Sequence, residues 1–165
     1  MIIGGYGFGF GGGGVLETVE TIRLVDKKDL RNSLCMIKPY PFRIESHAGT
    51  IFGNRPLVCG GNNPSKGSTN ECKMYNPQTN EWTAMISMLT TKYLHDVVNV
   101  NEDIYVFGGY GGNSYQSWIS MQLFSTGIWR SITNTPIFMR YHCAVKLDNN
   151  TILSTGGLDG SNVSK

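Results

Sequence analysis

The sequence predicts an all-β chain built from repeated units of four short antiparallel strands. Three markers recur with a period of about 48 residues, namely a glycine pair after an apolar run, a histidine and a tryptophan. The first glycines of the pairs, which are 56, 48 and 48 residues apart, are Gly4, Gly60, Gly108 and Gly156. A constant period of this length is typical of repeat architectures in which each unit packs on its neighbours.

The histidine and the tryptophan keep the phase of the glycine pair. His47, His95 and His142 are 48 and 47 residues apart, and each lies 13 or 14 residues before its glycine pair. Trp82 and Trp129 are 47 apart and lie 22 and 21 residues after theirs. The phase defines the units 1–46 (repeat 1, partial and divergent), 47–94 (repeat 2), 95–141 (repeat 3) and 142–165 (repeat 4, truncated).

Four strands can be assigned most clearly in repeat 3. Two runs of β-forming residues, 95–100 and 104–107, flank a turn, and two more, 118–124 and 128–132, flank another. Repeat 2 ends on the same scheme, with strands at 71–75 and 81–85 around an Asn-Pro turn. In repeat 1 the tryptophan position falls near Leu34 or Cys35, and the run Gly11 to Gly14 is interpreted as an inserted loop.

The recurring residue types suit the packing of one sheet on the next. A glycine pair at a strand end permits positive φ and lets a neighbouring backbone approach closely. One tryptophan in each unit can fill the gap between twisted sheets. A single four-stranded unit is marginally stable, so each repeat depends on its neighbours.

Residues 70–85, Asn-Glu-Cys-Lys-Met-Tyr-Asn-Pro-Gln-Thr-Asn-Glu-Trp-Thr-Ala-Met, together with the period and the glycine pairs, resemble the kelch repeat. The resemblance covers nearly the whole chain, most strongly from about 47 to 157. It implies a partial kelch-type β-propeller made of four-stranded antiparallel blades. Known propellers have roughly 4 to 8 blades, so we expect a partial sequence or an open arc.

The kelch resemblance also implies a binding scaffold for a protein partner, without enzymatic activity and without a cofactor. Kelch adaptors bind partners through residues after the glycine pair and basic residues before the first strand, on loops that the blades hold. Carried over by position, the candidate partner-binding residues are Tyr6, Arg43, Lys92, Tyr93, Tyr110, Asn113, Tyr115, Arg140 and Tyr141. Tyrosine and arginine are common interface anchors, and ordinary loop solvation is the alternative for each residue.

Several functions remain open within this family. The scaffold could be a substrate-recognition module of a cullin-type ubiquitin ligase, an actin-associated module or an extracellular adhesion domain. The alternative from another class is a kelch-fold enzyme, either a copper oxidase similar to galactose oxidase or a sugar-modifying enzyme. The three histidines recur at one repeat phase, which favours a structural role over metal binding or acid-base chemistry.

Composition and motifs argue against other classes of function. The net charge is +2 with scattered basic residues, so nucleic acid is not an expected partner. The longest uncharged stretch, 1–16, is half glycine and fits neither a signal peptide nor a membrane span. Gly7, Gly9 and Gly12 formally match a dinucleotide-binding fingerprint, but this needs a helix after residue 14, and an inserted glycine loop is favoured.

The four cysteines do not have the spacing of a zinc site. Cys59 and Cys72 flank the loop after a glycine pair and are expected on adjacent strands of one blade. Two interpretations stay open, a disulfide or two buried free thiols, and we favour the thiols of a cytosolic protein. A bridge would indicate an extracellular protein.

Overall fold

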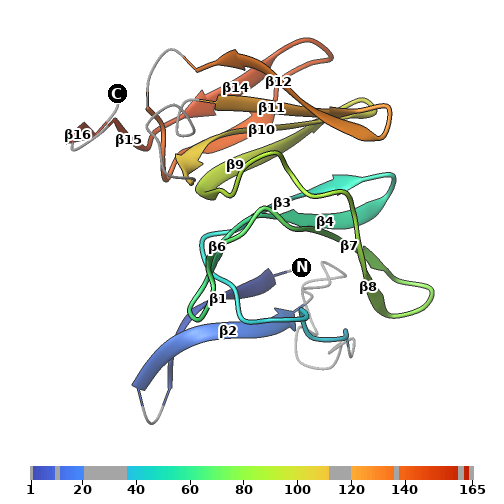
Figure 1. Cartoon of the computed structure of the whole chain (residues 1–165), viewed down its shortest axis with the longest axis vertical. Coiled ribbons are helices and arrows are strands. Elements are labelled where there is room, and N and C mark those ends of the chain that lie inside the picture. The colour runs from blue at the N-terminus through green and yellow to red at the C-terminus, as the bar shows by residue number, and fades with distance from the viewer. Residues whose placement is uncertain are drawn as a thin grey trace, which may run out of the picture.

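A computed structural model describes residues 2–9, 12–20, 37–111, 120–135, 138–159 and 162–163. Within these residues the regular secondary structure consists of β-strands, and each pair of bonded strands is antiparallel. The all-β fold with four-stranded antiparallel sheets is therefore confirmed. The sheets of repeats 2 and 3 lie one above the other along the long axis of the molecule (Figure 1).

Repeat 2 forms a complete four-stranded sheet. Its strands, in both chain and sheet order, are β3 (Ala48–Phe52), β4 (Arg55–Cys59), β7 (Cys72–Asn76) and β8 (Glu81–Ala84). A small hairpin, β5 (Asn62–Asn63) and β6 (Gly67–Ser68), lies in the loop after the glycine pair. Apart from this hairpin, strands that are adjacent in the sheet follow one another along the chain, so no connection crosses the sheet.

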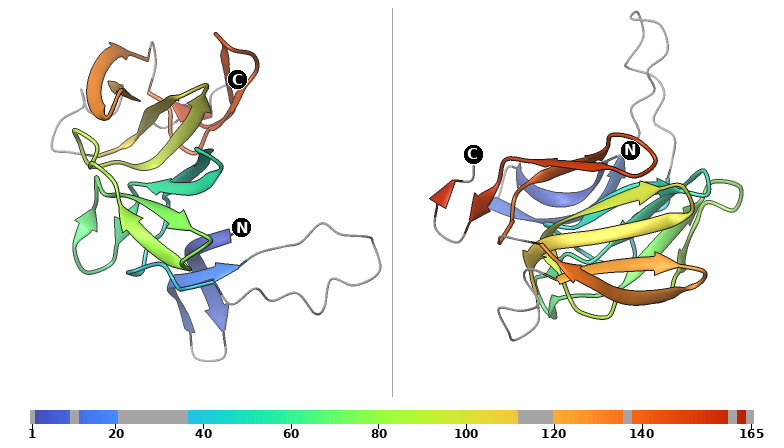
Figure 2. Two further views of the ribbon diagram at one scale, coloured as in Figure 1. Left: turned by 90° about the vertical axis from the view of Figure 1, so that its right-hand side faces the viewer. Right: turned by 90° about the horizontal axis from the view of Figure 1, so that it is seen from above.

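Repeat 3 repeats this topology and repeat 4 contains its first half. The strands of repeat 3 are β9 (Tyr93–Val100), β10 (Asp103–Tyr110), β11 (Ser120–Ser125) and β12 (Ile128–Asn134). Repeat 4 consists of the hairpin β13 (Cys143–Lys146) and β14 (Ile152–Thr155), followed by β15 (Leu158–Asp159) and β16 (Asn162–Val163). Figure 2 shows the β13–β14 hairpin beside the sheet of repeat 3.

The N-terminal glycine-rich segment forms strands where the sequence suggested an inserted loop. β1 (Ile2–Gly9) pairs with β2 (Gly12–Glu20), so Gly12 to Gly14 belong to a strand. That part of the loop interpretation is wrong. The backbone N–H and C=O groups of these glycines bond to an antiparallel partner strand, whereas in a loop they would be left to solvent. The dinucleotide fingerprint also loses its support, since a strand occupies the start of the required helix.

The main hydrophobic core lies between the sheets of repeats 2 and 3. Because side chains alternate across a strand, one face of each sheet points into this core. Its buried members are Ala48, Leu57, Cys59, Cys72, Met74, Met88, Val97, Ile104, Val106, Phe124 and Trp129. A second cluster, built on Val98, Val100 and Phe107, joins the opposite face of repeat 3 to Ala144 and Ile152 of repeat 4.

Trp82 and Trp129 occupy matching places. The indole N–H of Trp82 donates to the Lys38 carbonyl at 3.0 Å, and that of Trp129 donates to the Ile86 carbonyl at 2.9 Å. Lys38 and Ile86 are 48 residues apart, so both acceptors lie at one repeat phase. Each indole therefore ties the fourth strand of a repeat to the segment that leads into that repeat, in addition to filling space.

Candidate functional site

Two kinds of residue lie together at one edge of the molecule. One kind lies two positions before each repeated histidine, and the other directly follows each glycine pair. These residues pair across the backbone beside the glycine pairs of repeats 2, 3 and 4, as Glu45 with Asn62, Tyr93 with Tyr110 and Arg140 with Leu158. The equal register places the six residues along one rim, which we call the loop rim. Rigid paired strands thus hold side chains that belong to loops in sequence terms.

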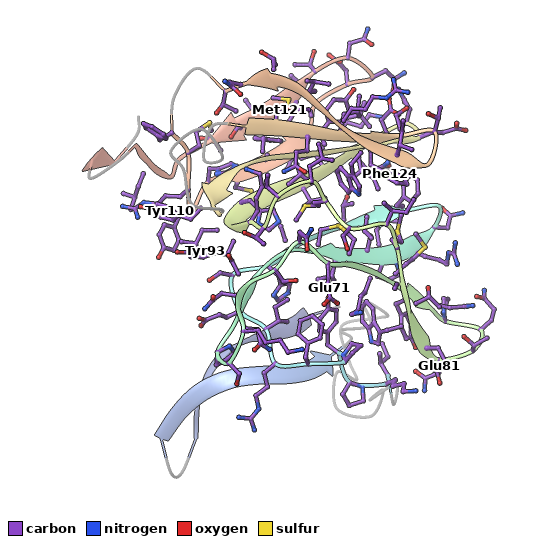
Figure 3. The ribbon with its side chains drawn as sticks, viewed as in Figure 1. Glu71, Glu81, Tyr93, Tyr110, Met121 and Phe124 are labelled. Atoms are coloured by element: carbon purple, nitrogen blue, oxygen red, sulfur yellow. A yellow bond between two sulfur atoms is a disulfide. The ribbon has the colours of Figure 1, made fainter. Side chains whose placement is uncertain are left out.

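Tyr93, Tyr110 and Arg140 form a stack on the loop rim. The tyrosine rings are stacked with centroids 5.7 Å apart, and Figure 3 shows the two side chains together at the same edge. The Arg140 guanidinium carbon lies 4.7 Å from the centre of the Tyr110 ring, and Arg140 Nη1 donates to the Tyr110 hydroxyl. A cation over an aromatic face is attracted by the ring quadrupole, so the arginine is held in one orientation.

Tyr141 lies next to this stack and projects into solvent with 63% of its surface exposed. Its backbone has φ of 55°, in the left-handed region that costs a tyrosine about 1 kcal/mol or more. The Tyr141 N–H donates to the Leu94 carbonyl of β9 at 3.3 Å, which helps to hold this conformation. The equivalent residues Ser46 and Leu94 also have positive φ, at 53° and 57°.

The three basic candidates do not share one environment, contrary to expectation. Arg43 is exposed, Arg140 is half-buried on the loop rim, and Lys92 is fully buried. Lys92 Nζ donates to the Gly108 carbonyl at 3.1 Å, and burial lowers the pKa of Lys92 to about 8. The surface role expected for Lys92 is wrong, because it lies three residues before His95 whereas Arg140 lies two before His142.

Three other candidates lie wholly or partly outside the described structure. Asn113 and Tyr115 fall outside the described residues. Tyr6 lies in β1 opposite Val15, and only its backbone is described. Sequence analysis did not single out Glu45 and Asn62, which occupy the loop rim in repeat 2. Asn62 Nδ2 donates a hydrogen bond to Glu45 Oε1 at 3.0 Å. Both residues could have been found from the sequence, because they lie at the same offsets from the histidine and the glycine pair as Tyr93 and Tyr110 do.

His47 and His142 directly precede β3 and β13, and His95 lies near the start of β9. His95 is buried, and desolvation, with a smaller contribution from the Lys92 charge, lowers its pKa to about 3. The pKa of His142 is also lowered, chiefly by burial, while Asp96 opposes the shift. Among the residues that the structure describes, no three His, Cys, Asp or Glu side chains are grouped as a metal site would require.

Cys59 and Cys72 are directly opposite each other on β4 and β7, and their sulfurs are joined in a disulfide with an S–S distance of 2.08 Å. The free-thiol interpretation favoured from the sequence is therefore not what the structure contains. The pairing register of β4 and β7 brings the two sulfurs together, because it places Cys59 and Cys72 opposite each other. Cys143 is exposed and free.

Comparisons with known proteins agree with the repeat geometry. The family profile described as Kelch motif matches residues 92–136, which correspond closely to repeat 3. Repeat 3 thus matches a kelch motif, and the chain is similar to kelch-repeat proteins. Kelch-like protein 15 from Homo sapiens is 27% identical over 161 aligned residues, and the same protein from Mus musculus matches equally. The human match covers 84% of this chain and 26% of that protein.

A second kelch relative extends the comparison. Kelch repeat and BTB domain-containing protein 12 from Homo sapiens is 29% identical over 96 residues, covering 53% of this chain and 15% of that protein. The chain thus spans about a quarter or less of the length of these curated relatives. In the described part of the chain, no helix is long and apolar enough to cross a membrane.

Proposed function

We propose that this kelch chain is a protein-binding scaffold without enzymatic activity, and that its partner docks on the loop rim. The observation that carries the proposal is the fixed Arg140 guanidinium on the Tyr110 ring, with the exposed Tyr141 beside it. Aromatic rings and arginine give large contact area or directed hydrogen bonds for little loss of conformational entropy, and both are enriched among binding hot spots.

The chemistry of the stack favours a partner segment that carries a carboxylate. A guanidinium can pair with both oxygens of a carboxylate, and its planar shape makes this pairing directional. The stack of Tyr93, Tyr110 and Arg140 is largely preorganised, so little ordering cost remains to be met on binding. The exposed Tyr141 ring adds apolar contact area next to the charge.

The finer assignment that we propose is substrate recognition for a cullin-type ubiquitin ligase. Support comes from a relative whose name includes a BTB domain, since a BTB domain joined to kelch repeats indicates ubiquitin ligation. The complete transcript that encodes this chain tests the assignment. A BTB or F-box segment in frame with the chain supports it, whereas a secretion signal in frame contradicts it and favours an adhesion domain.

Selection of phage-displayed random peptides on the immobilised chain tests the binding proposal directly. We expect enriched peptides to contain Asp or Glu and to bind in solution with micromolar affinity, measured by calorimetry. Arg140→Ala and Tyr141→Ala should each weaken binding at least about tenfold, or roughly 1.4 kcal/mol. Arg130→Ala is the matched control, because Arg130 is an exposed arginine on β12 outside the loop rim.

Two results would contradict the proposed function. Peptides that bind equally well to wild type and to both rim variants would place the binding surface elsewhere. Stoichiometric copper in the purified protein, measured by elemental analysis, would favour the copper-oxidase alternative over a scaffold.

A further inference from the structure

The loop rim carries opposite charges at equivalent positions beside the glycine pairs of repeats 2 and 4. Glu45 and Arg140 each lie two residues before a repeated histidine. Glu45 exchanges two backbone hydrogen bonds with Asn62, at 3.1 and 2.8 Å. Arg140 exchanges the same two bonds with Leu158, at 3.3 and 2.9 Å. Because backbone pairing sets the direction of a side chain, the carboxylate and the guanidinium leave the rim in the same register.

The Glu45 carboxylate is held in place and keeps its charge. Asn62 Nδ2 donates to Glu45 Oε1 at 3.0 Å, and this amide donor is neutral. Glu45 is half-buried, and within the part of the chain that the structure describes it forms no ion pair, not even with the exposed Arg43 two residues earlier. A positioned, partly desolvated charge attracts an opposite charge more strongly than a fully solvated one does.

Backbone contacts between repeats give the spacing of the two charged positions. The Leu94 N–H donates to the Ser46 carbonyl at 2.9 Å, and the Tyr141 N–H donates to the Leu94 carbonyl at 3.3 Å. Segments bonded in this way lie about 5 Å apart, so two such steps separate Glu45 from Arg140 by about 10 Å. An extended peptide advances about 3.3 Å per residue and covers this distance in about three residues.

The middle of the loop rim is aromatic and carries no charge. Tyr93 and Tyr110 stack with centroids 5.7 Å apart at one edge of the molecule (Figure 3). Aromatic rings of this kind supply apolar contact area and a hydroxyl for hydrogen bonds, but no charge preference. Along the rim, a carboxylate is therefore followed by an aromatic pair and then by a guanidinium. This order suits a segment with charges at both ends and none between them.

We propose that the loop rim selects a partner segment in which a Lys or Arg lies about three residues from the Asp or Glu that pairs with Arg140, and that Glu45 binds this basic residue. This inference rests on the proposed function, because Arg140 fixes one end of the segment. It adds a second charge requirement to that function. A segment with acidic residues at both places is disfavoured, since like charges would meet at Glu45.

Peptides selected by phage display on the wild-type chain and on the Glu45→Lys variant test the proposal. We expect wild type to select a Lys or Arg about three residues from an Asp or Glu, and Glu45→Lys to select an acidic residue at that place. Glu102→Lys is the matched control and should select the same peptides as wild type. Glu102 is an exposed glutamate in the turn between β9 and β10, at the opposite end of these strands from Tyr93 and Tyr110.

Titration calorimetry with a synthetic peptide of the wild-type consensus measures the contact with Glu45. Replacing the basic residue of this peptide with Ala should weaken binding to wild type at least about threefold. The same replacement should leave binding to Glu45→Gln unchanged, because Gln can still accept the Asn62 hydrogen bond but carries no charge. Circular dichroism of each variant checks that it is folded.

Failure of this inference can be told apart from failure of the proposed function. Binding that requires Arg140 but shows no basic residue at a constant distance from the acidic one would overturn the role of Glu45 alone. The same conclusion holds if the Ala peptide is weakened equally with wild type and with Glu45→Gln. If no peptide is selected, or if binding is unchanged in both Arg140→Ala and Glu45→Gln, the inference and the proposed function are overturned together.

Discussion

His142 of repeat 4 lies directly against Gly108 of repeat 3, so a Cβ on Gly108 would stand 2.4 Å from the Cε1 atom of His142. Gly108→Ala should therefore lower the free energy of unfolding by about 2 to 4 kcal/mol, from the left-handed backbone together with the clash. Gly127→Ala is the control, because Gly127 also has positive φ but has open space around it. Urea denaturation should show a clearly smaller loss for Gly127→Ala; equal losses would contradict a role for the close approach of His142 to Gly108.

Trp129→Phe should destabilise the chain more than Trp82→Phe. Both substitutions remove an indole N–H that donates to a carbonyl, but Trp129 is buried in the main core whereas Trp82 is half-buried. An unsatisfied carbonyl in the more buried place costs more, and we expect about 1 to 3 kcal/mol for Trp129→Phe. Chemical denaturation measures both losses, and a larger loss for Trp82→Phe would contradict this account.

Stability should fall as the pH is lowered below about 6.5. His95 has a pKa of about 3 in the folded chain, because it is buried, and about 6.5 when unfolded. Protons therefore bind the unfolded state preferentially between these values, and the loss should reach about 2 kcal/mol at pH 5. His95→Gln should flatten the dependence of the melting temperature on pH between 7 and 5. An unchanged slope would show that other groups cause it.

The Cys59–Cys72 disulfide should contribute roughly 3 kcal/mol, because it closes a short loop in the unfolded chain. Reduction should lower the melting temperature, whereas Cys143→Ser should leave it unchanged, since Cys143 is exposed and free. Alkylation of unreduced protein followed by mass spectrometry should modify Cys143 but not the bridged pair. Modification of Cys59 and Cys72 would support the free-thiol alternative. A bridge in protein from its native source would indicate an oxidising compartment.

Much of the fold follows from local pattern. The strands expected at 104–107 and 128–132 fall inside β10 and β12, because β-forming residues between turn residues favour strands wherever the chain is placed. The glycine-rich N-terminus was misassigned, because a run of glycines by itself indicates a turn or loop. Its strand structure depends on the pairing of β2 with β1.

The candidate site was predictable only in part. Tyr93, Tyr110 and Arg140 lie together because their offsets from the repeated histidine and glycine pair place them on paired strand ends, and their role in partner binding stays a prediction. Lys92 was treated as the equivalent of Arg140, although it lies one residue farther from its histidine than Arg140 does. In a strand or its extension, that shift moves a side chain from one side to the other, here from the surface into the core.

Local pattern in the sequence was enough to predict that four-stranded units recur and that glycine, histidine and tryptophan mark them, since each signal lies in residues that are close along the chain. The packing of distant segments, in contrast, is what places His142 beside Gly108 and Cys59 opposite Cys72. These facts depend on which segments, distant along the chain, pack against one another, and no local preference encodes a contact across that distance.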